Sequence, residues 1–271
     1  MDMEEDVVVI ACGGAARNVF GINSKTENLW DLYHRSLEDF GHPFHVVSKF
    51  FNTLPFDNPD YVASILDGRR IVIPFSILGG ELGTDVIKQT IEYARKSGCK
   101  VVSVLGIPMG FEPDRRERAF VALPEVAALS DCTLVLDLAK LMNTNMEIGK
   151  NRSWTVFLRM SDNIMTMSIK SIVEFMQGPF FTVFTEHMYS YVPASDVVPL
   201  NAVKNLWDTV MFDNFPLMNG SVIMVAANVR TSEIEDIQNE VVSKSGIMPE
   251  VVKREDSEDS KVLIFRAIRS F

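Results

Sequence analysis

Short apolar runs alternate with stretches of helical spacing through the first half of the chain. Runs that predict strands, because they are apolar and rich in β-branched residues, lie at 7–11, 70–75, 100–107 and 133–136. The run at 100–107 is apolar almost throughout, which is typical of a strand covered on both faces of a parallel sheet. Helical spacing at 86–96 and 119–129 follows two of these strands. The alternation predicts an α/β protein with a doubly wound, Rossmann-like parallel sheet.

The segments between these elements carry weaker patterns. Leucines among polar residues predict a helix at 26–37, and a shorter helix is expected at 61–66. His42 and His45 flank a proline in a Gly-Pro turn and are expected to lie in a loop. The segment 76–85 is expected to form another loop, at the carboxyl end of the strand before it.

The longest helical pattern covers 155–177. Its apolar stripe consists of Phe157, Met160, Ile164, Met167, Ile172 and Met176. Gly178 and Pro179 end this helix and indicate a domain boundary. We therefore expect three parts: a nucleotide-binding-like α/β domain at 1–154, a long central helix at 155–178 and a smaller C-terminal α/β domain at 179–271.

The C-terminal part is expected to have the order strand, helix, strand, strand (β-α-β-β). A strand at 221–227 precedes a helix whose capping box starts at Ser232, and Gly246 ends that helix. Two further strands, at 248–253 and 261–268, are expected to pair with each other around an acidic turn.

The composition limits the class of protein. With 271 residues, 47% hydrophobic and 23% charged, the chain can bury the core of one large or two ordinary domains. A net charge of −10 argues against binding to nucleic acid, which needs a basic surface. No apolar run approaches the roughly 20 residues of a membrane span, and the acidic segment 1–6 is unlike a signal peptide. We therefore expect a cytoplasmic protein with no direct membrane insertion.

The three cysteines, Cys12, Cys99 and Cys132, each lie in an apolar segment. None has a partner at the spacing of metal ligands, and an odd number does not form a disulfide framework. They predict buried, reduced thiols and no metal site.

The turn after the opening strand, Gly13-Gly14, is the first candidate for a ligand site. Glycines at a strand-to-helix turn let backbone N–H groups approach a phosphate. One reading is a Rossmann-type dinucleotide-binding protein. Against it, the turn lacks the Gly-x-Gly-x-x-Gly spacing, and no acid ends a second strand about 20 residues further on.

Several segments, in the same order, resemble FtsZ, the tubulin-like GTPase of prokaryotic cell division. They are 13–18 (Gly-Gly-Ala-Ala-Arg-Asn), 107–116 (Ile-Pro-Met-Gly-Phe-Glu-Pro-Asp-Arg-Arg), 127–142, 161–175 and 222–271. The chain is similar to a divergent member of this FtsZ/tubulin-like family. The resemblance implies the FtsZ/tubulin type of doubly wound fold.

The resemblance also implies a site for GTP or GDP, with Mg²⁺ able to accompany the nucleotide. The residues that it places around the nucleotide are Gly13, Gly14, Asn18, Gly79, Gly80, Gly83, Thr84, Glu112, Arg116 and Asp162. Asn18 and Asp162 take the family's positions at the guanine edge, and Glu112 and Arg116 take those near the ribose. Each of these four side chains also fits a solvated surface residue.

Two departures weaken the expected chemistry. Where the family has Gly-Gly-Gly-Thr-Gly-Thr/Ser-Gly around the phosphates, segment 78–85 carries Glu81 and Asp85, whose charges repel phosphate. The family's Asn-x-Asp-x-x-Asp loop, which supplies the hydrolytic acid, is absent. Glu186 is the nearest carboxylate and Asp196 a poorer candidate, so no catalytic residue is assigned.

The resemblance therefore implies an assembly protein that associates with itself or with another FtsZ-like protein. Such a pseudo-GTPase would bind GTP or GDP and hydrolyse GTP weakly or not at all. The alternative is a nucleotide-free interaction or regulatory module with the same fold, which explains Glu81, Asp85 and the missing acid loop directly.

Overall fold

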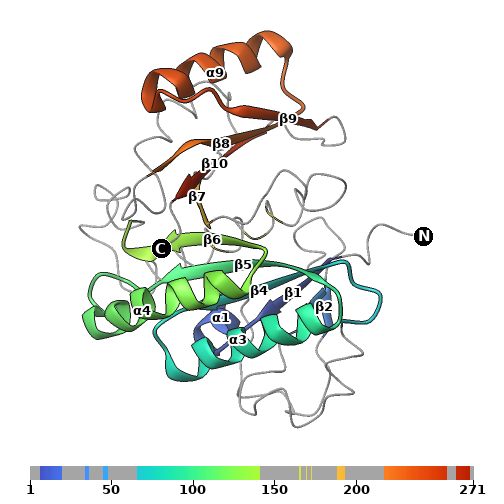
Figure 1. The fold of residues 1–271 in the computed structure, drawn as a ribbon, viewed down its shortest axis with the longest axis vertical. Helices are drawn as coiled ribbons and strands as arrows, with labels where there is room; N and C mark the ends of the chain where they lie inside the picture. Colours follow the sequence, from blue (N-terminus) through green and yellow to red (C-terminus); the bar gives the residue numbers. More distant parts are fainter. Residues whose placement is uncertain are drawn as a thin grey trace.

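The computed structural model describes residues 7–19, 34–36, 45–47, 66–140, 188–192, 217–254 and 261–268, with positions 165, 169 and 172 of a further helix. Within these residues the strands form one mixed sheet in the order β2-β3-β1-β4-β5-β6-β7-β10-β8-β9 (Figure 1). Figure 1 shows α3 and α4 lying along the N-terminal part of this sheet and α9 at its other end.

Four parallel strands form the N-terminal part of the sheet. They are β1 (Val7–Ala11), β4 (Ile71–Ile77), β5 (Lys100–Ile107) and β6 (Cys132–Asp137). Nearly every residue of these strands is buried, which explains why their sequences are continuous apolar runs. The helix α3 (Glu81–Lys96) joins β4 to β5, and α4 (Pro113–Leu129) joins β5 to β6. The short helix α1 (Gly14–Val19) follows β1. The predicted α/β class is confirmed.

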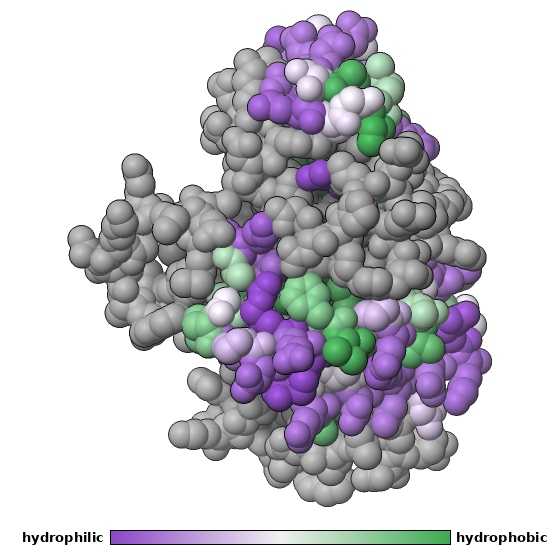
Figure 2. All heavy atoms as spheres, turned by 60° about the vertical axis from the view of Figure 1, so that its left-hand side comes forward, coloured by the Kyte–Doolittle hydropathy of each residue, from purple (hydrophilic) through white to green (hydrophobic). Residues whose placement is uncertain are grey.

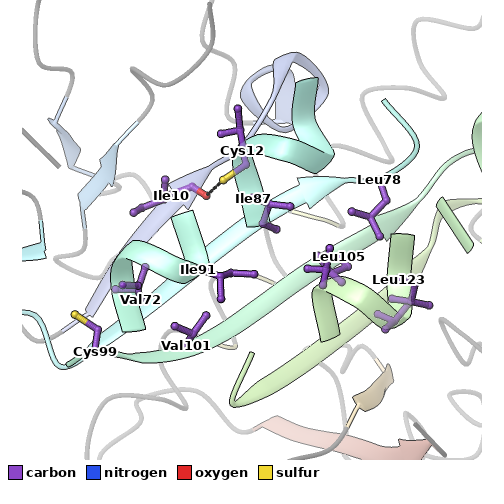
Figure 3. Packing of buried hydrophobic residues seen from close by; sticks show 14 of the residues in the cluster. Ile10, Cys12, Val72, Leu78, Ile87, Ile91, Cys99, Val101, Leu105 and Leu123 are labelled. Atoms are coloured by element: carbon purple, nitrogen blue, oxygen red, sulfur yellow. Dashed lines mark hydrogen bonds between the residues drawn. The ribbon is translucent and has the colours of Figure 1, made fainter. Parts of the chain in front are cut away.

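Helices cover both faces of this parallel part. Leu105 of β5 lies in the apolar cluster that α3 and α4 form on the sheet (Figure 3). Gly106 faces the other way, because side chains alternate along a strand, and a Cβ there would lie 3.4 Å from Cε of Met165. Met165, Ile169 and Ile172 are helical positions and fully buried. Their helix covers the second face, so the sheet is doubly wound.

One residue of the predicted stripe is described in this helix. Ile172 is fully buried, as the stripe predicts, and Met165 and Ile169, which the stripe did not include, are buried at helical spacing from it. The other residues of the stripe lie outside the described residues and stay predictions.

Two predictions near the sheet's first edge are wrong. The end of the helix predicted at 26–37 is the strand β2 (His34–Ser36), which pairs antiparallel with β3 (His45–Val47). His45, expected in a loop, is therefore a strand residue, and β3 in turn pairs parallel with β1. Pairing with a sheet edge is a long-range contact, and it overrides the local helical spacing of the leucines. His42 lies outside the described residues.

The C-terminal strands continue the same sheet. β7 (Met188–Val192) pairs with β6 on one side and with β10 (Lys261–Ile268) on the other. β8 (Leu217–Ala227), α9 (Thr231–Ser245) and β9 (Glu250–Arg254) complete this part. The helix α9 buries Ile234, Ile237 and Val241 against β8 and β10. The domain boundaries expected at 154 and 178 lie outside the described residues and stay predictions.

Two details of the C-terminal prediction are corrected. β9 and β10 do not pair: β9 lies parallel to β8 on one side, and β10 lies antiparallel to β8 on the other. The helix between β8 and β9 returns the chain to the same end of the sheet, so β9 must run parallel to β8. The capping box is also displaced, since α9 starts at Thr231 and the backbone N–H of Arg230 donates to Glu233 (3.1 Å).

Candidate functional site

The turns that follow β1 and β4 meet at the carboxyl end of the sheet. The backbone N–H of Cys12 donates to the carbonyl of Phe75 (2.7 Å), which joins the ends of the two strands. The Ser76 hydroxyl donates to the carbonyls of Cys12 (3.0 Å) and Gly83 (3.4 Å). The Gly13-Gly14 turn and the segment 76–85 are therefore brought together in space, although Cys12 and Ser76 are 64 positions apart in the chain.

Packing requires two of the predicted site glycines, and a third is tightly packed. A Cβ at Gly13 would lie 2.7 Å from Cα of Gly83, and a Cβ at Gly79 would lie 1.9 Å from the carbonyl oxygen of Arg115. Both glycines have left-handed backbone, with φ of +91° and +78°. A Cβ at Gly83 would lie 3.2 Å from Oγ of Ser76. These glycines bring the two turns and α4 into backbone contact.

Two other glycines of the same turns have no such neighbours. A Cβ at Gly14 or Gly80 would meet no heavy atom within 4 Å. Gly14 is exposed at the start of α1, and Gly80 is half-buried at the N-cap of α3. Packing within the described residues therefore leaves open space beside these two backbones.

The segment 81–85, predicted as part of a loop, is the first turn of α3. The helix starts at Glu81, and the N–H of Thr84 donates to the carbonyl of Gly80 (3.2 Å). Glu81, Leu82 and Asp85 are exposed there. A carboxylate in the first turn stabilises a helix through its dipole, and it sets negative charge where a bound phosphate would be expected. These carboxylates set negative charge beside the N-terminus of α3, and that charge opposes the approach of an anion.

The segment between β5 and α4 holds the remaining described candidates. The helix starts at Pro113, six residues before the predicted start, with Glu112 at its N-cap. Oε1 of Glu112 accepts a hydrogen bond from Nη1 of Arg115 (2.6 Å) within this turn. Phe111 beside it is about half exposed (51%). Glu112 therefore lies at the same carboxyl edge of the sheet as the glycine turns.

Arg116 contacts a residue that the sequence analysis did not single out. Its Nη1 and Nη2 donate to Oδ1 (2.6 Å) and Oδ2 (2.9 Å) of Asp137, at the end of β6. The side chain of Asp137 is 2% exposed, and the hydrogen bonds to it raise the pKa of Arg116. The sequence does carry a signal for Asp137, because it is an acidic residue at the end of an apolar strand. An acidic residue is rarely buried there without a partner.

The cysteines are not part of the candidate site. Cys12, Cys99 and Cys132 are buried and free, as predicted. Cys12 lies in the apolar cluster under the turns (Figure 3), and burial raises the pKa of its thiol to about 12. A thiol that stays protonated is a poor nucleophile.

Other candidates are not positioned by the structure. Asn18 lies in α1, but its side chain is not described. Asp162, Glu186 and Asp196 lie outside the described residues. Among the residues that are described, no group of three side chains could hold a metal ion. None of the described helices is long and apolar enough to cross a membrane.

The outer surface of α3 and α4 is polar. Figure 2 shows hydrophilic residues gathered over the part of the molecule that these helices occupy, with smaller apolar areas among them. Lys88 of α3 forms an ion pair with Glu125 of α4, and Arg95 donates to the carbonyl of Leu129 (2.9 Å). These contacts join the two helices along the face away from the sheet.

Curated relatives match part of the chain. The cell division protein FtsZ 1 of Pyrococcus horikoshii is 29% identical over 119 residues, which are 44% of this chain and 31% of that protein. FtsZ of Helicobacter pylori is 25% identical over 124 residues, 45% of this chain and 31% of that protein. The matches thus span less than a third of these relatives' length. No protein-family model matches the chain.

Solved structures match nearly all of the chain. An FtsZ dimer from M. jannaschii has a TM-score of 0.69 at 16% identity, covering 97% of this chain and 88% of that chain. CetZ from Methanosaeta thermophila has a TM-score of 0.67 at 14% identity, covering 97% and 86%. TubZ of Bacillus thuringiensis serovar israelensis, in GDP-form protofilaments, has a TM-score of 0.63 at 12% identity, covering 98% and 87%. The fold is of the FtsZ/tubulin type.

Proposed function

We propose that the chain is a divergent member of the FtsZ/tubulin-like family, an assembly protein with a weak site for GTP or GDP. It associates with itself or with another FtsZ-like protein in the cytoplasm. It hydrolyses GTP slowly or not at all. The FtsZ dimer and the GDP-form TubZ protofilaments among its structural neighbours support this choice of ligand and of partner.

One observation carries the proposed ligand site. Gly14 and Gly80 lie on turns joined by the contact between Gly13 and Gly83, and packing requires neither of them to be glycine. The space that the described residues leave at both backbones lets phosphate oxygens approach N–H groups near the N-terminus of α3. Thr84 lies in the first turn of that helix. We assign the phosphates to this place.

The other assignments follow the family pattern. Asn18 and Asp162 are proposed at the guanine edge, and Glu112 is proposed near the ribose. Glu112 is half-buried and lies at the correct edge of the sheet for this role. No hydrolytic acid is assigned beyond the weak candidate Glu186.

Charge is the reason for expecting weak binding. Glu81 and Asp85 are exposed in the first turns of α3. At about 4 Å, two like charges repel by roughly 1 kcal/mol in water and about 4 kcal/mol near a protein surface. Mg²⁺ bound with the nucleotide reduces that repulsion, so we propose that binding depends on Mg²⁺.

A second candidate function is a nucleotide-free interaction module. Glu81 favours it, because its carboxylate already provides the negative charge that the N-terminus of α3 attracts. In this case the fold is retained for its surfaces, and the turns bind no anion.

Titration of the purified protein with GDP and with a non-hydrolysable GTP analogue separates the two functions. We expect millimolar to micromolar binding that needs Mg²⁺, and about tenfold tighter binding in Glu81→Gln, because one repulsive charge is removed. Glu92→Gln is the matched control, since Glu92 is an exposed acid elsewhere on α3. Absence of millimolar binding in both the natural chain and Glu81→Gln favours the nucleotide-free module.

Hydrolysis is tested separately by the dependence of turnover on protein concentration. A site completed by a neighbouring subunit speeds up as subunits associate, whereas a pseudo-GTPase releases phosphate at a background rate at every concentration. Glu186→Ala leaves a concentration-dependent rate unchanged if Glu186 is not the acid.

A further inference from the structure

Arg116 was expected to contact a ligand, but the described structure commits its guanidinium to the protein. Nη1 and Nη2 donate to the two oxygens of Asp137 at 2.6 and 2.9 Å, and Nη1 also donates to the carbonyl of Pro108. Such a bidentate pair is strong and geometrically specific. The ring of Phe120 lies 5.5 Å from the guanidinium carbon.

The pair is shielded from water. The side chains of Arg116 and Asp137 are 18% and 2% exposed. Oδ1 of Asp137 also accepts a hydrogen bond from the backbone N–H of Ala139 (2.9 Å). Removing one member of such a pair leaves the other charge buried without a partner, which is strongly unfavourable. Arg116 therefore cannot move to a ligand without leaving the buried carboxylate of Asp137 without its charged partner.

These contacts join three segments at the carboxyl edge of the sheet. Pro108 follows β5, Asp137 ends β6, and Arg116 is in the first turn of α4. Two residues further along α4, Nε of Arg118 donates to the carbonyl of Gly79 (3.0 Å) in the turn after β4. The start of α4 thus holds both the segment that carries Glu112 and the turn that carries Gly80.

We propose that Arg116 is a positioning residue: through Asp137 and Pro108 it holds segment 108–112 at the ligand edge of the sheet, and it does not itself contact the nucleotide. This inference rests on the proposed function for the identity of the ligand. It replaces the expectation that Arg116 binds near the ribose.

The two roles predict opposite effects of Asp137→Asn. If Arg116 contacts the nucleotide, loss of the Asp137 charge frees a guanidinium for the anion, and binding tightens. If Arg116 positions the segment, the same substitution loosens it, and binding weakens. In metal sites, loss of an outer contact that orients a ligand typically costs about 10–100-fold in affinity, and we expect roughly tenfold here.

The experiment measures the dissociation constant of GDP with Mg²⁺ for Asp137→Asn, Arg116→Met and the double variant. We expect each single variant to weaken binding about tenfold and the double variant to be no weaker, because both residues act through one contact. Arg116→Lys keeps the charge but not the bidentate geometry, so it should bind GDP more tightly than Arg116→Met and more weakly than the natural chain. If Asp137→Asn does not fold, the comparison of Arg116→Lys with Arg116→Met still tests the positioning role.

The matched control is Asp131→Asn. Asp131 precedes β6 at the amino ends of the parallel strands, away from the candidate site. There it accepts hydrogen bonds from Lys100 (3.3 Å) and from the N–H of Val101 (2.8 Å). This variant makes the same chemical change away from the site, and it should leave GDP affinity unchanged. Tighter binding in Asp137→Asn, or additive losses in the double variant, would overturn the positioning role.

If the natural chain binds no GDP, the proposed function fails, and amide hydrogen exchange decides the inference instead. Segment 108–112 then exchanges faster by the same factor in Asp137→Asn and Arg116→Met, and at the natural rate in Asp131→Asn. Unchanged exchange in the first two variants overturns the positioning role.

Discussion

Two adjacent glycines, Gly79 and Gly80, have opposite structural requirements. Gly79 has a left-handed φ of +78°, and its backbone lies against the carbonyl of Arg115 in α4. Gly80 has a φ of −88°, which any residue adopts, and open space where a Cβ would lie. The sequence has glycine at both positions, and only the approach of α4 shows that packing among the described residues requires glycine at position 79 and not at position 80.

We expect Gly79→Ala to lower the free energy of unfolding by about 2–6 kcal/mol, since left-handed strain and overpacking each cost about 1–3 kcal/mol. Gly80→Ala should cost about 1 kcal/mol or less, the difference between these residues at an N-cap. Urea denaturation followed by circular dichroism measures both variants. Equal losses at the two positions would contradict the packing role of Gly79.

At the scale of elements, the sequence located the end of α9 better than it located the helix starts. The N-cap residues of α3, α4 and α9 are Gly80, Glu112 and Arg230, and no side chain of these caps bonds its helix N-terminus in the usual Ser, Thr, Asp or Asn manner. Each of these helices starts earlier than predicted. The end of α9 was predicted correctly, because Gly246 adopts left-handed backbone there (φ +71°).

Substitution of Gly246 tests that end of α9. A Cβ at Gly246 meets no atom of the described residues within 4 Å, so we attribute the cost of a side chain there to backbone strain. We expect Gly246→Ala to cost about 1–2 kcal/mol and Gly246→Asn less, since Asn tolerates the left-handed region. Thermal unfolding of the two variants gives the comparison. A larger loss for Asn than for Ala would show that the cap is not held by backbone conformation.

At the scale of the whole molecule, β7 is the strand that makes one sheet of the described strands. Ser190 pairs with Val135 of β6 and with Arg266 of β10. The N-terminal strands and the C-terminal strands are therefore joined by backbone hydrogen bonds on both sides of a single strand. Loss of the backbone hydrogen bonds of β7 should therefore destabilise both the N-terminal and the C-terminal part of the sheet.

We expect the natural chain to unfold in one transition, seen at the same denaturant concentration by circular dichroism and by tryptophan fluorescence. Ser190→Pro removes a backbone donor between two neighbouring strands and should lower stability by about 3 kcal/mol or more, or separate the transition into two. Ser190→Thr keeps the donor and serves as the control. Two transitions in the natural chain would show that the parts unfold independently.

The sequence by itself determined the parallel strands, the burial of the cysteines and the end of α9, because each depends on a local run of residue types or on one glycine's backbone. Tertiary structure alone decided the rest. It showed that Gly79 serves packing, that Arg116 is bound by Asp137, and that β9 and β10 lie on opposite sides of β8. The physical reason is that these contacts join residues far apart in the chain, and local periodicity carries no record of which distant partner each residue meets.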